Sequence, residues 1–286
     1  MIYISWFEIA YSILDVVVSP IVFSHNSIFL VFASAKDKFL SKFTFSILNS
    51  VYCGFFGSSM GMFAIHFMNR YFIATGSFSQ TFKGNRIFLW MFIPPIYGII
   101  WGSSLHFLCG PNEKLNREIE YPLLTAFDLK TEDIVYVGPY IYQKNLNGAY
   151  EIDQNSVIAI AIMWCLLGSS FFAIIYFGTR CHIHISKFSK TTSSQGVSLQ
   201  SQLFFALVTQ TMIPVVLMQI PCAILFTCTF LNTNLGQLSG ISTITIAIFP
   251  AIDPLPTMLI VKNYRVAISG FFRNYKVVKV ERRAGI

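Results

Sequence analysis

Six long apolar runs, separated by short polar segments, constrain this chain more than any other feature of its sequence. The hydrocarbon core of a bilayer is about 30 Å thick, which an α-helix crosses with roughly 20 apolar residues. The runs that reach this length lie at 2–23, 45–68, 87–108, 157–177, 203–227 and 238–261. The chain is only 12% charged, whereas a soluble domain is about 25% charged. We therefore predict an all-α membrane protein that forms a single domain.

Lys and Arg are concentrated in every second segment between the runs. The segments at 69–86 and 178–202 and the tail at 262–286 carry basic residues with at most one acid. The segment at 109–155 has four basic and eight acidic residues. Because basic segments stay on the cytoplasmic side, we predict a cytoplasmic C-terminus and place 109–155 outside. The segment at 25–42 is the exception, since alternation places it outside although it is mildly basic.

The two ends of the chain raise separate expectations. With six spans and a cytoplasmic tail, the N-terminus is also inside, and the first run begins with no cytoplasmic lead. A chain that lacks one helix upstream of this run would begin in this way.

In the tail, aromatic and apolar residues recur at helical spacing over 263–276, which predicts a helix on the inner leaflet. A solvated basic tail is the alternative. Contact with the anionic leaflet explains the net charge of +7 better than a nucleic-acid partner does.

Three acids lie inside the apolar runs, where each charge costs about 2.5–3.5 kcal/mol. Glu8 and Asp15 are seven residues apart in the first run and therefore share one helical face. They either line a central cavity, as an ion or ligand site, or satisfy polar groups at helix breaks. Asp253 lies between Pro250 and Pro254 in the last run. Because prolines loosen a helix, we predict that Asp253 and Pro254 form a switch or hinge.

Small residues and prolines predict how the helices pack and bend. Gly57 and Gly61 in the second run are spaced so that another helix backbone can approach closely. Pro94–Pro95 in the third run and Pro214 and Pro221 in the fifth predict kinks. We therefore expect a central, tightly packed second run, with bent helices around it.

The sequence contains none of the catalytic motifs that we searched for. There is no phosphate-binding glycine loop, zinc-protease helix or nucleophile elbow. Cys181, His182 and His184 lie close together, but no second cluster of metal ligands accompanies them. We expect no enzyme activity, no cofactor and no metal site. The ligand-facing residues cannot be assigned, because the polar candidates Gln210 and Gln219 share one helix with Thr211.

Two short sequences near the ends of predicted helices carry a family resemblance. Asn69-Arg70-Tyr71 directly follows the second run, and Asp253-Pro254 lies in the last run, shortly before the basic tail. Both resemble elements of rhodopsin-like G-protein-coupled receptors. Further matching stretches lie at 7–15, 52–57, 63–72 and 100–102. Together, in this order, they are similar to the nematode serpentine chemoreceptors of the Str type.

This resemblance implies a seven-helix receptor whose first helix is absent here, so that the run at 2–23 corresponds to the second helix of the family. It implies a chemosensory, olfactory-type receptor in the plasma membrane of a sensory cilium. Its partners would be a small ligand, such as a volatile compound, and a heterotrimeric G protein. Asn69, Arg70 and Tyr71 would couple to the G protein. Asn69 replaces the acid of the family pattern, so Arg70 needs another partner at rest.

Two alternatives remain. A receptor remnant that lacks its first helix would be retained in the endoplasmic reticulum and would not signal. A transporter or channel subunit would be expected to show intramembrane charges on several helices or an internal repeat, neither of which is present. An inverted channel subunit would also place the tail outside, against the distribution of basic residues.

Overall fold

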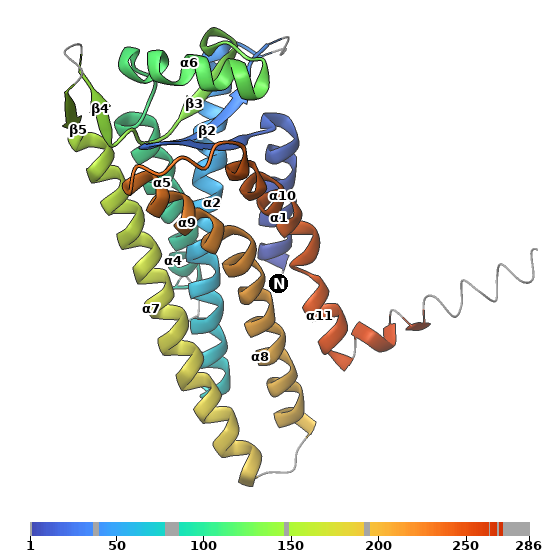
Figure 1. The fold of residues 1–286 in the computed structure, drawn as a ribbon. Coiled ribbons are helices and arrows are strands. Elements are labelled where there is room, and N and C mark those ends of the chain that lie inside the picture. Colours follow the sequence, from blue (N-terminus) through green and yellow to red (C-terminus); the bar gives the residue numbers. More distant parts are fainter. Residues whose placement is uncertain are drawn as a thin grey trace, which may run out of the picture.

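The computed structural model describes residues 2–36, 40–77, 86–145, 149–191, 195–262, 264–267 and 269–270. Long helices run side by side, and a small sheet with one further helix covers one end of the bundle (Figure 1). We call this the capped end, and we call the opposite end, where α2 ends and α7 leads toward α8, the far end. Most of the predicted tail helix at 263–276 lies outside the described residues.

The bundle confirms the predicted class of an apolar, mainly helical membrane protein. Its helices are α1 (Ile2–Val18), α2 (Lys42–Ala74), α4 (Arg86–Met91), α5 (Ile93–Leu108), α7 (Gln154–Thr191), α8 (Gln195–Pro214), α9 (Ile220–Phe230), α10 (Gly240–Ile252) and α11 (Leu255–Ile260). Within the described ranges, four helical stretches are long and apolar enough to cross a membrane: Lys42–Ala74, Phe88–Leu108, Gln154–Lys187 and Ser201–Phe230. They coincide with the second to fifth predicted runs. The count of six spans stays a prediction, because α1 is shorter and the last run is divided.

The first run ends earlier than the sequence pattern indicated. α1 stops at Val18, and residues 21–23 belong to a strand rather than to the helix. Ser19 adopts a positive φ of 50°, and Pro20 follows it without a backbone N–H. The prediction of a helix over 2–23 is therefore wrong in its last five residues.

Prolines mark the interruptions of the other helices. Pro94 and Pro95 lie in the first turn of α5, just after the break that separates it from α4. α8 ends at Pro214, a π-helical turn follows at Val215–Gln219, and Pro221 lies in the first turn of α9. Because proline donates no backbone hydrogen bond, each site loses one rung of the helix ladder. The fifth run is thus one long helix with a π-helical turn in its middle.

The cap is built from three antiparallel strands and one helix. The strands are β1 (Ile21–His25), β2 (Ile28–Ser34) and β3 (Ile134–Val137), and they lie in that order. The helix is α6 (Glu113–Phe127), which the Asn112 side chain caps by accepting a hydrogen bond from the Leu115 amide at 2.8 Å. A separate hairpin, β4 (Tyr142–Lys144) and β5 (Tyr150–Ile152), leads into α7.

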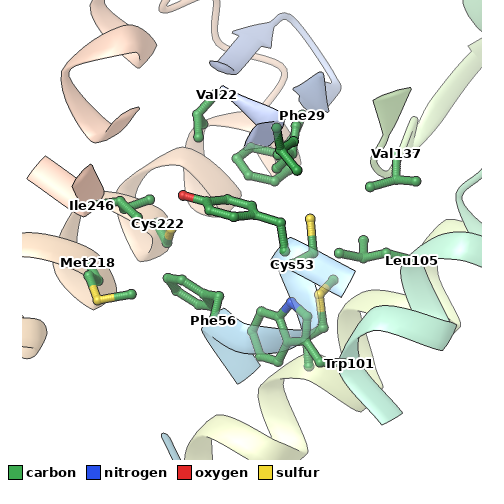
Figure 2. Close-up of a cluster of buried hydrophobic side chains, with 14 of the residues drawn as sticks. Val22, Phe29, Cys53, Phe56, Trp101, Leu105, Val137, Met218, Cys222 and Ile246 are labelled. Carbon is green, nitrogen blue, oxygen red and sulfur yellow. The ribbon is translucent and has the colours of Figure 1, made fainter. Parts of the chain in front are cut away.

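The two faces of the sheet are both buried, but against different neighbours. One face packs under α6, in a cluster that contains Phe23, Leu30, Phe32, Leu115, Ile119 and Leu123. The other face joins the core of the bundle through Val22, Phe29, Val31 and Val137. Figure 2 shows this shared core, in which Val22 and Phe29 of the cap lie above Cys53, Phe56 and Cys222 of the helices. The cap and the bundle are therefore joined by one continuous hydrophobic core.

α2 is the central helix and packs most closely against α5. A Cβ atom added at Gly54 would lie 2.8 Å from the Gly98 carbonyl oxygen, and one added at Gly102 would lie 2.8 Å from the Ser50 carbonyl oxygen. A Cβ atom at Gly57 would lie 2.5 Å from the Cβ atom of Trp101. Gly54, Gly98 and Gly102 allow the two backbones to touch, whereas Gly57 lies against the side chain of Trp101. Of the predicted pair Gly57 and Gly61, it is Gly61 that faces the α5 backbone, because a Cβ atom there would lie 3.1 Å from the Cα atom of Pro94.

Candidate functional site

Asn69, Arg70 and Tyr71 lie in the last turns of α2 at the far end. The Tyr71 ring packs against Phe177 of α7, with 5.6 Å between the ring centroids. Both belong to a cluster that joins three helices: Phe67 and Tyr71 of α2, Phe177, Cys181 and Ile185 of α7, and Phe204 and Leu207 of α8. We call these residues the far-end cluster. The Tyr71 side chain therefore packs α2 against α7 at the far end.

Arg70 projects from this cluster with no acidic partner among the described residues. It is half-buried and lies beside the thiol of Cys181, a fully buried residue on α7. An ion pair of the described residues joins Arg117 and Glu113 in the cap, far along the chain from Arg70. The Oδ1 atom of Asn69 is buried and has no hydrogen-bond partner in the described part of the chain. Within the described residues, the Arg70 guanidinium group therefore has no acidic partner and the neighbouring Asn69 side chain has a buried oxygen without a hydrogen bond.

A second polar group joins α1 to the last helix. The carboxyl groups of Glu8 and Asp253 lie close enough to interact, although the two residues are far apart in the sequence. Two carboxylates that share a site repel each other, so a proton shared between them would stabilise this pair. Asp253 is 1% exposed, and one of its carboxyl oxygens has no partner among the described residues.

The backbone at Asp253 is held by a third helix. The Gln210 side chain of α8 donates a hydrogen bond of 3.1 Å from its Nε2 atom to the Asp253 carbonyl oxygen. Asp253 and Pro254 lie between α10 and α11, where the last helix is interrupted. Pro254 removes a donor from this stretch, and a side chain of a neighbouring helix stabilises the break.

Asp15 lies two turns along α1 from Glu8 but contacts a different helix. Its carboxyl group interacts with the Tyr52 hydroxyl of α2. The ring of Tyr52 packs against Tyr11, with 5.3 Å between centroids. The structure thus places Glu8 and Asp15 on the side of α1 that faces the bundle, each against its own partner. The ion-site and structural interpretations of these two acids both stay predictions.

α8 contacts both predicted sites, the residues around Arg70 at the far end and the break at Asp253. Phe204 and Leu207 belong to the far-end cluster, and Gln210 binds Asp253 less than one turn further along the same helix. The sequence identified Gln210 only as a polar residue of unknown direction. Its partner could not be predicted, because the pairing depends on how α8 and the last helix cross.

The interior of the bundle contains a cavity of about 20 Å³ at the π-helical turn. Gln219 borders it together with aromatic residues of α2, α5, α7 and α9. The Gln219 side chain contacts the sulfur of Met60 through Nε2 at 2.6 Å, and its Oε1 atom has no partner in the described ranges. A space of this size holds about one water molecule. A larger ligand here would require the helices to separate.

The long apolar helices and the acids paired between them define a multi-pass membrane protein. The model of the serpentine-type seven-transmembrane G-protein-coupled chemoreceptors, Str, matches residues 1–269. The chain therefore belongs to this family of chemoreceptors.

Several relatives support this membership. G-protein coupled receptor str-217 of Caenorhabditis elegans is 38% identical over 275 residues, which is 95% of this chain and 78% of that protein. Serpentine receptor class r-10 of the same organism is 26% identical over 273 residues, 95% of this chain and 80% of its own length. G-protein coupled receptor str-33 is 24% identical over 265 residues, covering 92% of this chain and 77% of that protein. No solved structure matches the chain.

Proposed function

We propose that this receptor binds a small ligand, such as a volatile compound, and signals through a heterotrimeric G protein at the far end. The observation that supports this most is Arg70, which is half-buried between α2 and α7 and has no acidic partner among the described residues. A guanidinium group has five N–H donors and is always charged, so it can bind carbonyl or carboxylate groups of a partner. Asn69 and Tyr71 complete this coupling surface.

The distribution of charge supports an orientation with the capped end outside. The segment that forms α6, β3 and the β4–β5 hairpin is acidic, whereas the segments near the far end are basic. We therefore place the C-terminus in the cytoplasm. Membership of the chemoreceptor family supports a location in the plasma membrane of a chemosensory cilium. Protease protection of a C-terminal epitope tag in intact cells tests this placement. An externally cleaved tag would contradict it and favour an inverted channel subunit.

The ligand would act by choosing between two packings of the helices. The cavity beside Gln219 lies between α2, α5, α7 and α9, in the half of the bundle nearer to the cap. A small molecule that prefers a slightly expanded cavity would shift the population toward that packing. α8 would then move against both the Asp253 break and the far-end cluster, and this would expose Arg70 to the G protein.

Coupling can be tested before any ligand is known. Membranes that contain the receptor and a heterotrimeric G protein are treated with apyrase, solubilised, and passed over an affinity resin for the receptor. We expect the G protein to be retained without nucleotide and released by GTPγS, because receptors bind the nucleotide-free form. A receptor that stays in the endoplasmic reticulum and never retains G protein would be the non-signalling remnant instead.

The Glu8–Asp253 pair makes a prediction about stability. Asp253→Ala removes a buried carboxyl group and leaves the half-buried Glu8 without its neighbour, and a polar group left without a partner in this way costs about 1–3 kcal/mol. We expect a strong loss of surface receptor and a melting temperature lowered by several degrees in detergent. Asp253→Asn keeps the shape and can donate to Glu8, so it should fold.

Glu120→Ala is the matched control, because Glu120 is an exposed acid on α6 of the cap. It should leave both the surface level and the melting temperature unchanged. Equal stability of Asp253→Ala and Glu120→Ala would show that the carboxyl pair contributes nothing to the fold.

A further inference from the structure

A hollow lies on the side of the bundle, between α1, α2 and α5. This groove has a volume of about 730 Å³, within the usual range of about 300–1,000 Å³ for small-molecule sites. Along α2 it extends from Phe43 to Ser58, which corresponds to about 22 Å of helix. It lies along two of the stretches that are long and apolar enough to cross a membrane, so any occupant enters from the bilayer.

The floor of the groove is flat, because it is made of glycine and serine at the contact of two helices. Gly54, Gly98 and Gly102 all line it, and they are the residues that bring α2 and α5 into backbone contact. No side chain projects from these positions into the groove. A flat apolar floor offers the most contact to a rigid, planar ring system.

Aromatic side chains form the walls. Phe7 of α1 stacks on Phe55 of α2, with 5.3 Å between the ring centroids. Phe43 and Phe107 border the groove near the cap and are 73% and 79% exposed. Ile99, which is 68% exposed, borders it from α5. These side chains leave room that the rest of the described chain does not fill.

The groove has few polar groups, and one of them, His106, lies at the end of the groove nearer to the cap. His106 shares a hydrogen bond of 2.8 Å between its Nδ1 atom and the Ser50 hydroxyl. Its other ring nitrogen, Nε2, remains able to bind a ligand hydroxyl. The Ser103 hydroxyl and the Tyr3 hydroxyl are engaged by backbone carbonyl groups of Ile99 and Met91. The Ser58 hydroxyl lies at the opposite end of the groove along α2, on the glycine floor. The groove is therefore an apolar surface with His106 as its polar contact at the end nearer to the cap.

From this shape and polarity we infer that the groove binds a sterol-class lipid, with its rings on the glycine floor and its hydroxyl group at His106. Apart from His106, none of the residues that line the groove can carry a charge near neutral pH. A phospholipid headgroup would therefore find no Lys or Arg for its phosphate among the described lining residues. A rigid ring system also loses less conformational freedom on binding than two flexible acyl chains lose. This inference does not depend on signalling through a G protein.

The test uses purified receptor in phosphatidylcholine vesicles with a photoreactive cholesterol analogue as the probe. Ile99→Trp fills the groove from α5 without disturbing the contact of the glycines. Ile175→Trp is the matched control, since Ile175 lies on α7 away from the groove and is 65% exposed. We expect labelling to fall at least about fivefold in Ile99→Trp, which corresponds to about 1 kcal/mol, and to stay unchanged in the control.

A second variant tests the polar contact and does not depend on how Ile99→Trp folds. Cholesterol should compete for labelling of the wild-type receptor better than its analogue without the hydroxyl group. His106→Phe keeps an aromatic ring but removes the nitrogen atoms, so this preference should disappear. Equal labelling of both tryptophan variants, or equal competition by excess phosphatidylcholine, would overturn the inference and show non-specific lipid contact only. Crosslinks to a second copy of the receptor would overturn it as well.

Discussion

Replacing Arg70 with alanine should abolish retention of the G protein while the receptor still reaches the cell surface. Arg70 has no acidic partner among the described residues, so its removal breaks no ion pair within that part of the fold. A charged hydrogen bond to a partner is worth about 1.5–3 kcal/mol. We therefore expect binding of the nucleotide-free G protein to weaken at least about tenfold. The apyrase pull-down and surface labelling of the same cells provide the two measurements.

Arg180→Ala is the control for this experiment. Arg180 is also a basic residue of the far end, but it is exposed, and its guanidinium carbon lies 5.7 Å from the centre of the Tyr176 ring. Its removal lowers the charge of the surface by the same amount and should reduce retention only slightly. Equal losses in both variants would show that the G protein recognises overall charge rather than the position of Arg70. Normal signalling in Arg70→Ala would refute the proposed coupling surface.

Replacing Gly98 with leucine should prevent the receptor from folding. Any Cβ atom at this position collides with the Ser58 hydroxyl oxygen and lies 2.7 Å from the Gly54 carbonyl oxygen. Relief requires α5 to move away from α2, and α2 is the central helix of the bundle. Overpacking of a core costs about 1–3 kcal/mol, and more where a backbone must shift. We expect little or no receptor at the surface and a small monomer peak in size-exclusion chromatography.

Gly168→Leu is the control for Gly98→Leu, because it makes the same substitution at a glycine that has no close neighbour. Gly168 of α7 is also a glycine inside a long apolar helix, and a Cβ atom added there meets nothing within 4 Å. Gly168→Leu should fold normally, because an exposed helical glycine gains stability from a side chain by up to about 1 kcal/mol. If Gly98→Leu and Gly168→Leu reach the surface equally, the close contact of α2 and α5 is not needed.

The bundle could be predicted from the sequence because its signal is long and local. The second to fifth apolar runs each reach membrane length, and the glycines of 45–68 predicted close packing. The sheet could not be predicted in the same way. β2 is buried on both faces, so its sequence lacks the alternation of a half-buried strand and reads as a short apolar stretch. β1 was hidden because residues 21–23 continue the apolar run of α1.

The candidate site could be predicted as a set of residues but not as a set of contacts. Asp253 and Glu8 were singled out because charged groups are rare inside apolar runs. Their pairing joins the first and the last helix, and sequence spacing contains no information on such a contact. The same holds for Gln210, whose bond to the Asp253 carbonyl group depends on the crossing of α8 and the last helix. The proposed partner of Arg70 is another protein, so no contact within this chain could reveal it.

The position of α8 has a consequence for how affinity is measured. One helix contacts both the far-end cluster and the Asp253 break, so a shift of α8 changes the two places together. Energetic coupling between two sites is reciprocal. If a ligand strengthens G-protein binding through α8 by some factor, the bound G protein strengthens ligand binding by the same factor. The receptor alone and the receptor in complex with a G protein should therefore report two different ligand affinities, and their ratio measures the coupling free energy between the two sites.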